Sequence, residues 1–85
     1  MAGVLSQPLP RDIREESPSA RLIYSALQEA DRSLTVNELV ARTGAAPATT
    51  RRVLSGFRDR EIVKSTPHPL DARAKMWSVA SQEER

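Results

Sequence analysis

Apolar residues recur at three- and four-residue spacing after Ser17, and this pattern predicts an amphipathic helix over residues 18–30. Its buried face would carry Ala20, Ile23, Leu27 and Ala30. Ser17 is a good N-cap, and Pro18 suits the first helical position, where its missing N–H has no hydrogen bond to lose. Asp31 and Arg32 are expected to end this helix.

Two shorter helical patterns follow and meet near Gly44. Thr35 and Glu38 have the spacing of a capping box, in which each side chain bonds the backbone amide of the other residue. The positions expected to face the core are Val36, Leu39 and Val40. Gly44 then stops the helix, because glycine adopts the left-handed backbone conformation at little cost.

The next helix is expected to start at Pro47 and to have one apolar and one polar face. The apolar stripe consists of Thr50, Val53, Leu54 and Phe57. The opposite face carries Ala48, Arg51, Arg52, Ser55 and Asp59. A glycine inside a helix costs about 1 kcal/mol relative to alanine, so Gly56 indicates a close approach on that side.

The last third of the chain has the pattern of strands. Residues 61–66 and 74–80 are predicted to be extended, with Trp77 and Val79 on one face toward the core. Residues 67–73 contain two prolines and no strand pattern, so they are predicted to form a loop. Ser33 and Leu34 are long enough for one short extended step.

This order of elements predicts an α+β fold of the winged helix-turn-helix type, with three helices, a short strand and a C-terminal β-hairpin wing. The winged helix domain is expected over residues 17–80, followed by a short tail at 81–85. Residues 1–16 have no sustained periodicity and are predicted to be a flexible leader. Parts of the leader could still attach to the domain through Val4, Leu5, Leu9 and Ile13.

Composition narrows the possible functions of this domain. The chain has 85 residues and no cysteine, which excludes a zinc finger, an iron–sulfur site, a thiol nucleophile and a disulfide framework. No signal peptide or long apolar segment is present, so we expect a cytoplasmic protein without a membrane span. His68, the single histidine, lies on a proline-flanked loop, a poor scaffold for catalysis or a metal. We therefore predict no enzymatic activity, no metal site and no cofactor.

The charge is unevenly distributed. The whole chain has a net charge of +2, but residues 46–79 carry seven basic and three acidic residues, a net charge of +4. Three arginines and no acidic residue lie between Ala46 and Arg58. Such a local positive patch is typical of a face that binds phosphate.

The helix-turn-helix interpretation places the candidate DNA-binding residues on two elements. Those on the exposed face of the helix after Pro47 are Thr49, Arg51, Arg52 and Ser55. Those on the wing are Arg73 and Lys75. The alternatives are a solvated helix face and, for Arg73, an ion pair with Asp71. No side chain at Ala46 can cap the helix, so its free amides would bind either a phosphate or water.

The chain also resembles a known family. The motifs that carry the resemblance are Ser-Pro-Ser-Ala-Arg-Leu-Ile-Tyr at 17–24, Leu-Thr at 34–35, Ala-Thr-Thr-Arg-Arg-Val-Leu at 48–54, Glu-Ile-Val at 61–63 and Asp-Ala-Arg at 71–73. They are similar to those of archaeal, especially halophilic, winged-helix regulators related to MarR. The resemblance covers about residues 17–79 and implies a transcription factor that binds double-stranded DNA.

Two function classes remain open at this point. The first is a sequence-specific regulator that binds double-stranded DNA, with the helix after Pro47 in the major groove and the wing on the adjacent backbone. The alternative is a winged-helix module for protein interaction within a transcription or recruitment complex, which the fold alone does not separate from the first. A homodimer is possible, through the exposed side of the first helix and the apolar residues of the leader.

Overall fold

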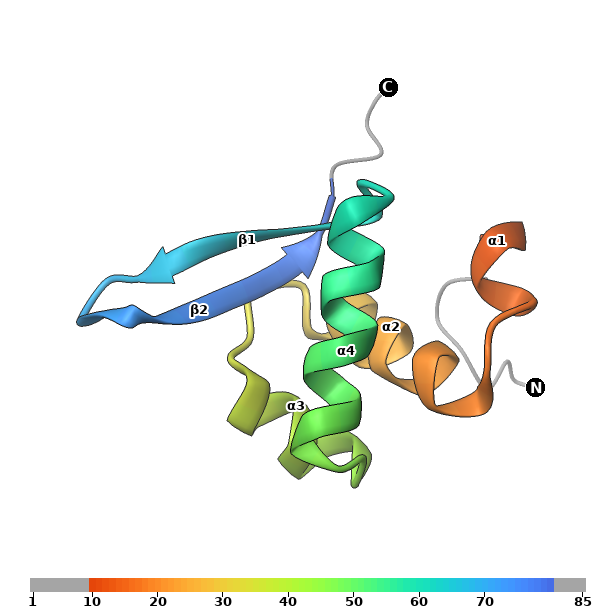
Figure 1. Cartoon of the computed structure of the whole chain (residues 1–85), viewed down its shortest axis with the longest axis horizontal. Helices are drawn as coiled ribbons and strands as arrows, with labels where there is room; N and C mark the ends of the chain where they lie inside the picture. The colour runs from red at the N-terminus through yellow and green to blue at the C-terminus, as the bar shows by residue number, and fades with distance from the viewer. Residues whose placement is uncertain (1–9, 81–85) are drawn as a thin grey trace.

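The computed structural model describes residues 10–80, which fold into four helices followed by a two-stranded antiparallel hairpin (Figure 1). In chain order the elements are α1 (Arg11–Arg14), α2 (Pro18–Ala30), α3 (Val36–Thr43), α4 (Pro47–Asp59), β1 (Val63–His68) and β2 (Asp71–Val79). The helices α3 and α4 form the helix-turn-helix, and the hairpin is the wing. The predicted α+β winged helix-turn-helix fold is confirmed. None of the described helices is long and apolar enough to cross a membrane.

The helix boundaries follow from local chemistry, as the sequence predicts. The Ser17 hydroxyl accepts a hydrogen bond from the Ala20 amide at 3.2 Å and caps α2, which begins at Pro18. Thr35 and Glu38 form the expected capping box at the start of α3. Gly44 ends α3 with a φ of 77°, the left-handed conformation that favours glycine.

The core lies where α2, α3 and α4 meet the wing. Within residues 10–80 its largest fully buried side chains are Ile13, Ile23, Tyr24, Leu34, Leu39, Thr50, Leu54 and Phe57. The rings of Tyr24 and Phe57 meet edge to face with centroids 6.2 Å apart, a favourable arrangement for two aromatic rings. All four residues of the predicted apolar stripe of α4 are buried, so α4 turns the face predicted to be apolar toward the core.

The prediction of a leader without regular structure over residues 1–16 is wrong for its last part, because residues 11–14 form the short helix α1. Ile13 is completely buried in the core, as the alternative interpretation of this segment allowed. The Arg21 guanidinium donates to the backbone oxygens of Arg14 and Glu16 at 3.2 Å. The sequence does not predict α1 because a single helical turn is too short to show periodicity. The contacts of Ile13 and Arg21 also join residues that are apart in the sequence, so no local pattern indicates them. Val4, Leu5 and Leu9 lie outside the described residues.

The wing is longer than the sequence predicts. The segment expected to be a loop pairs as strand through His68 and again from Asp71, which leaves two residues for the turn. Pro67 pairs opposite Lys75, with an irregularity in the register directly after it. Within the described chain β1 pairs only with β2, and an open strand edge tolerates a residue without an N–H. The first strand starts two residues later than predicted, because Glu61 has a positive φ of 62°.

The short extended step at Leu34 attaches the wing to the helices. Leu34 and Trp77 exchange two backbone hydrogen bonds of 2.8 Å each, so Leu34 lies beside β2 as an isolated bridge. Trp77 turns toward the core, as predicted, and is 5% exposed. This bridge sets the position of β2 relative to α3, which begins two residues after Leu34.

One expectation about α4 is wrong. The sequence predicts a close approach at Gly56, yet a methyl group added there would meet nothing within 4 Å. The residue is exposed and its backbone is helical, so it lowers the stability of the helix without any packing gain in this structure.

We expect Leu54→Ala to lower the free energy of unfolding by about 2–5 kcal/mol, because Leu54 is fully buried in the core. The matched control is Leu22→Ala, since Leu22 is 48% exposed and should lose less than about 1 kcal/mol. Urea unfolding followed by circular dichroism measures both. Equal losses for the two variants would contradict the packing of α4 described above.

We expect Gly56→Ala to raise the free energy of unfolding by about 0.5–1 kcal/mol, because alanine loses less conformational entropy in a helix and finds open space there. Gly44→Ala should instead lower it by about 1–2 kcal/mol, since Gly44 has a φ of 77° that alanine adopts only with strain. Thermal and urea unfolding of the two variants separate these effects. A stabilised Gly44→Ala protein would contradict the described end of α3.

Candidate nucleic-acid interface

The exposed face of α4 carries four of the six predicted site residues. The stripe of Thr50, Val53, Leu54 and Phe57 occupies the core side of the helix, so Arg51 and Arg52 project to solvent and are exposed. Thr49 and Ser55 are half-buried at the borders of this face. Neither arginine makes an ion pair or a side-chain hydrogen bond within residues 10–80. The face therefore presents two cations that no other part of the described chain neutralises.

The start of α4 lacks a side-chain cap, as the sequence predicts. Ala46 is the N-cap and makes no side-chain hydrogen bond, and Pro47 occupies the first turn. Buried Thr50 binds back into this turn, because its hydroxyl donates to the Ala46 oxygen at 2.9 Å. The next amides, of Ala48 and Thr49, lie at the positive end of the helix dipole, where an anion or water can accept from them.

The wing carries the other two predicted residues. The Arg73 guanidinium lies 3.5 Å from an Asp71 carboxylate oxygen, so the predicted alternative of an ion pair is present. The same carboxylate accepts a hydrogen bond from the Arg73 amide at 3.1 Å. The Arg73 side chain is nevertheless 94% exposed, and an exposed pair of this kind contributes little and leaves the cation accessible. Lys75 is exposed and has no ion-pair partner within the described chain.

The fold brings four of the six predicted residues to one groove between α4, the wing and the start of α3. The groove has a volume of about 470 Å³. The predicted residues that line it are Arg51, Ser55, Arg73 and Lys75. Thr49 and Arg52 lie outside it, so the predicted set divides into a groove and a flanking part of the helix face.

Two further lining residues, Arg58 and Trp77, do not belong to the predicted set. The sequence does contain a signal for Arg58, because it follows Arg51 by seven residues and therefore lies on the same helix face two turns later. For Trp77 the sequence favours a place in the core over a role as a stacking platform for nucleic-acid bases. Its position at both the core and the groove depends on the pairing of β2 with Leu34, which no local pattern shows.

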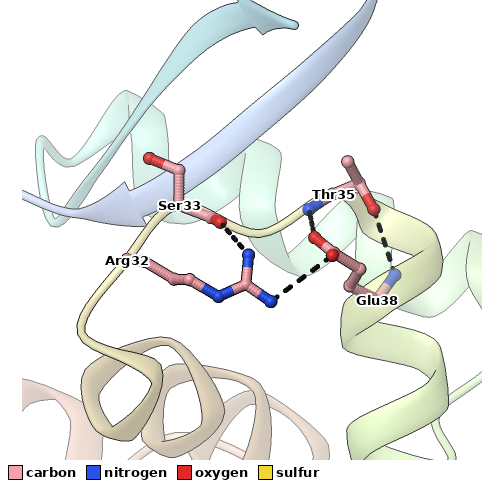
Figure 2. A network of polar contacts seen from close by, with 4 residues as sticks. All are labelled: Arg32, Ser33, Thr35 and Glu38. Atoms are coloured by element: carbon pink, nitrogen blue, oxygen red, sulfur yellow. Dashed lines mark hydrogen bonds and ion pairs between the residues drawn. The ribbon is translucent and has the colours of Figure 1, made fainter.

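The start of α3, which also lines the groove, is held by a small polar network (Figure 2). The Thr35 amide donates to the Glu38 carboxylate at 2.8 Å, and the Glu38 amide donates to the Thr35 hydroxyl at 3.1 Å. Arg32 lies 3.5 Å from the same carboxylate and donates to the Ser33 backbone oxygen at 3.2 Å. The hydrogen bond from the Thr35 amide, together with the positive charge of Arg32, lowers the pKa of Glu38 below its ordinary value.

The tip of the wing holds the single histidine. The His68 Nδ1 atom accepts a hydrogen bond from the Leu70 amide at 3.0 Å, which closes the turn between the strands. Within residues 10–80 no three His, Cys, Asp or Glu side chains are close enough to hold a metal ion. The hydrogen bond to the Leu70 amide gives His68 a structural role at the wing tip.

Comparison with known proteins gives a family and a fold. Residues 23–67 match the family described as the IclR helix-turn-helix domain. No curated protein matches the chain. Among solved structures, BpsR of Bordetella bronchiseptica, whose DNA binding is regulated by 6-hydroxynicotinic acid, superposes with a TM-score of 0.72 at 18% identity. That match covers 80% of this chain and 48% of BpsR.

Two further solved structures are similar. A mutant of MarR from E. coli, complexed with operator DNA, has a TM-score of 0.71 at 15% identity, over 84% of this chain and 50% of that one. The transcriptional regulator PcaV of Streptomyces coelicolor, bound to its natural ligand, has a TM-score of 0.71 at 20% identity, over 80% and 48%. The chain thus spans about half the length of these proteins. At such identities the similarity establishes the winged-helix fold.

We expect the stability contributed by Glu38 to depend on pH. The folded state lowers the pKa of Glu38 from 4.5, so its contribution is present above about pH 4.5 and is lost as the pH falls through the lower folded value. Glu38→Gln keeps a hydrogen-bond acceptor but has no charge to lose. Urea unfolding between pH 7 and pH 3 should give the wild type a higher free energy of unfolding than Glu38→Gln at pH 7. This difference should become smaller below pH 4.5.

The control for this prediction is Glu29→Gln. Glu29 is an exposed carboxylate without a bonding partner within residues 10–80, so it reports the effect of removing one negative charge. A stability difference between wild type and Glu38→Gln that stays constant across the pH range would contradict the described network.

Proposed function

Because the chain belongs to the IclR helix-turn-helix domain family, we propose that it binds double-stranded DNA sequence-specifically as part of a transcriptional regulator, with α4 in the major groove. The observation that carries this proposal is the exposed face of α4. It presents Arg51 and Arg52 without ion-pair partners in the described chain, and no acidic residue lies between Ala46 and Arg58.

The side chains on this face suit the recognition of base edges. Arginine forms two parallel hydrogen bonds to guanine in the major groove, and each such pair contributes about 1–3 kcal/mol of discrimination between bases. Ser55 and Thr49 border the arginines and can donate to or accept from bases or phosphates. The core holds the helix in place for this task, because its other face is buried from Thr50 to Phe57, about two turns.

The wing would contact the adjacent backbone. Arg73 and Lys75 lie on β2, and both are exposed. Two proteins of similar fold support the proposal, since the MarR mutant is complexed with operator DNA and the DNA binding of BpsR is regulated by 6-hydroxynicotinic acid. No enzymatic activity is part of the proposal.

The finer expectations from the sequence stay predictions. They are the relation to archaeal regulators of the MarR type, a cytoplasmic location and a homodimer. Ile13 is fully buried in the core of its own chain, so it is not available for a dimer contact. A module for protein interaction is the alternative that the following experiments test.

We expect the double variant Arg51→Ala and Arg52→Ala to bind duplex DNA at least about tenfold more weakly than wild type, through loss of base or phosphate contacts. The matched control is Arg11→Ala with Arg14→Ala, which removes the same charge from α1, on the opposite side of the molecule from the wing (Figure 1). Fluorescence anisotropy with a labelled random duplex at low salt measures both. Equal affinity of the two double variants would exclude α4 from the interface.

We expect the affinity of the wild type for duplex DNA to fall with salt, with a slope of about −3 to −4.5 in log K against log salt, if three to five phosphates are neutralised. The candidates are Arg51, Arg52, Lys75 and either Arg58 or Arg60. Of the last two, Arg60 pairs with Glu16 at 2.7 Å, whereas Arg58 has no ion-pair partner within residues 10–80. Titrations at several salt concentrations give the slope. A slope near zero would favour the protein-interaction module.

A further inference from the structure

We propose that Leu70, at the tip of the wing, is an apolar wedge that enters the minor groove of the bound duplex and separates two stacked base pairs. The proposal rests on the proposed function, since it assigns the tip to the same duplex that α4 would contact. It adds a way of reading sequence that the arginines of α4 do not have, because the cost of opening a base step depends on the bases that form it.

Leu70 has an unusually exposed apolar side chain for its place in the fold. It is 90% exposed, and within residues 10–80 only Leu22 is also an exposed large hydrophobic residue, at 48%. Tight turns are usually made by glycine, proline, asparagine, aspartate or serine, each of which suits the backbone geometry there. Leucine has no such advantage and gains no burial within its own chain, so its apolar surface is free to contact a partner.

The backbone around Leu70 is fixed by its neighbours. The ring of Pro69 fixes its own φ. The His68 Nδ1 atom accepts a hydrogen bond from the Leu70 amide at 3.0 Å. The Asp71 carboxylate accepts in the same way from the Arg73 amide, two residues ahead, at 3.1 Å. A side chain on such a restrained turn loses less conformational freedom when it binds, which favours its use as a contact.

The surroundings of Leu70 favour a duplex as its partner. Residues 64–75 carry three basic residues and one acidic residue, and Arg73 and Lys75 are exposed. A single leucine among cations is too small an apolar patch for a protein interface. The minor groove offers an apolar side chain a place between two rows of phosphates, which the cations can contact on either side.

The wing is long enough to bring its tip to the minor groove beside α4. Figure 1 shows the turn between β1 and β2 at the end of the wing that lies farthest from the helices. Lys75 lines the hollow next to α4, and Leu70 precedes it by five residues. At about 3.3 Å per residue, the tip lies up to roughly 16 Å beyond Lys75. The major groove is about 12 Å wide and the minor groove about 6 Å, so the tip can pass over one phosphate backbone and place a leucine in the minor groove.

A wedge gives the wing a sequence preference of its own. Leucine inserted between base pairs unstacks them and bends the duplex toward the major groove. Pyrimidine–purine steps such as TA and CA are the most easily kinked and unstacked. We therefore expect the bound DNA to carry such a step at a fixed distance from the bases that α4 contacts.

The first test selects binding sites from a pool of random duplexes with the full wild-type chain and with Leu70→Ala. The matched control is Leu22→Ala, which removes the other exposed leucine, on α2. We expect wild type and Leu22→Ala to enrich one pyrimidine–purine step beside the bases contacted by α4. Leu70→Ala should lose this step and keep the rest of the site. Leu70→Met, which keeps a long apolar side chain, should retain it.

The second test compares affinity, salt dependence and bending on one selected duplex. We expect Leu70→Ala to bind about threefold to tenfold more weakly than wild type. The slope of log K against log salt should not change, because leucine neutralises no phosphate. Lys75→Ala should instead make the slope less steep by about 1. Energy transfer between dyes at the two ends of the duplex should rise when wild type binds and rise less with Leu70→Ala.

His68 is tested as a positioning residue by two substitutions. His68→Ala removes the acceptor for the Leu70 amide, whereas His68→Asn keeps one, because asparagine bonds the amide two residues ahead in turns. We expect His68→Ala to lower affinity and bending toward the values of Leu70→Ala, and His68→Asn to restore them. Circular dichroism verifies that each variant folds. Wild-type bending by His68→Ala would overturn this positioning role.

The outcomes separate the two proposals. If Leu70→Ala matches wild type in selected sites, affinity and bending, or if wild type leaves the duplex unbent, the wedge is overturned while DNA binding stands. A weaker affinity together with a flatter salt slope would mean that Leu70 acts through phosphate contacts, which also overturns it. So would a change in the light-scattering mass of free Leu70→Ala, since it assigns the side chain to a contact between copies. If no duplex is bound even at low salt, the proposed function fails and the wedge with it.

Discussion

Two backbone hydrogen bonds of 2.8 Å between Leu34 and Trp77 connect the wing to the helices, and the functional face depends on this connection. A two-stranded hairpin is marginal in water by itself, so β1 and β2 need a third partner. Leu34 supplies it at the point where the chain passes from α2 to α3. The wing consequently has a set position beside α3 and α4, and the groove between them exists because of it.

Helix α4 and strand β2 each contribute side chains both to the core and to the exposed face. One side of α4 buries Leu54 and Phe57, and the other presents Arg51 and Arg52, so the packing that stabilises the helix also determines its orientation. Trp77 has a comparable double position, since it packs under the wing and lines the groove. Its N–H is the one polar side-chain group buried without a partner in the described chain.

The N-terminal helix α1 and the residues after it add a second long-range constraint. Ile13 is completely buried, and the Glu16 carboxylate pairs with Arg60 at the end of α4 at 2.7 Å. The Arg60 guanidinium also lies 6.0 Å from the centre of the Phe57 ring. These contacts join the segment before α2 to the end of α4. Arg60 is thereby a structural cation, whereas Arg58 two residues earlier faces the groove.

Features that depend on neighbours within about one helical turn could be predicted from the amino-acid sequence alone, and so could their order. The caps at Ser17 and Thr35, the stop at Gly44 and the buried stripe of α4 all follow from local hydrogen bonds and from periodicity. Features that depend on distant residues needed the folded chain: Ile13 holds α1 by packing, and the wing extends through Pro67 because β2 lies beside it. The groove is the clearest case, because its cations and Trp77 come from separate elements that strand pairing and burial join in space.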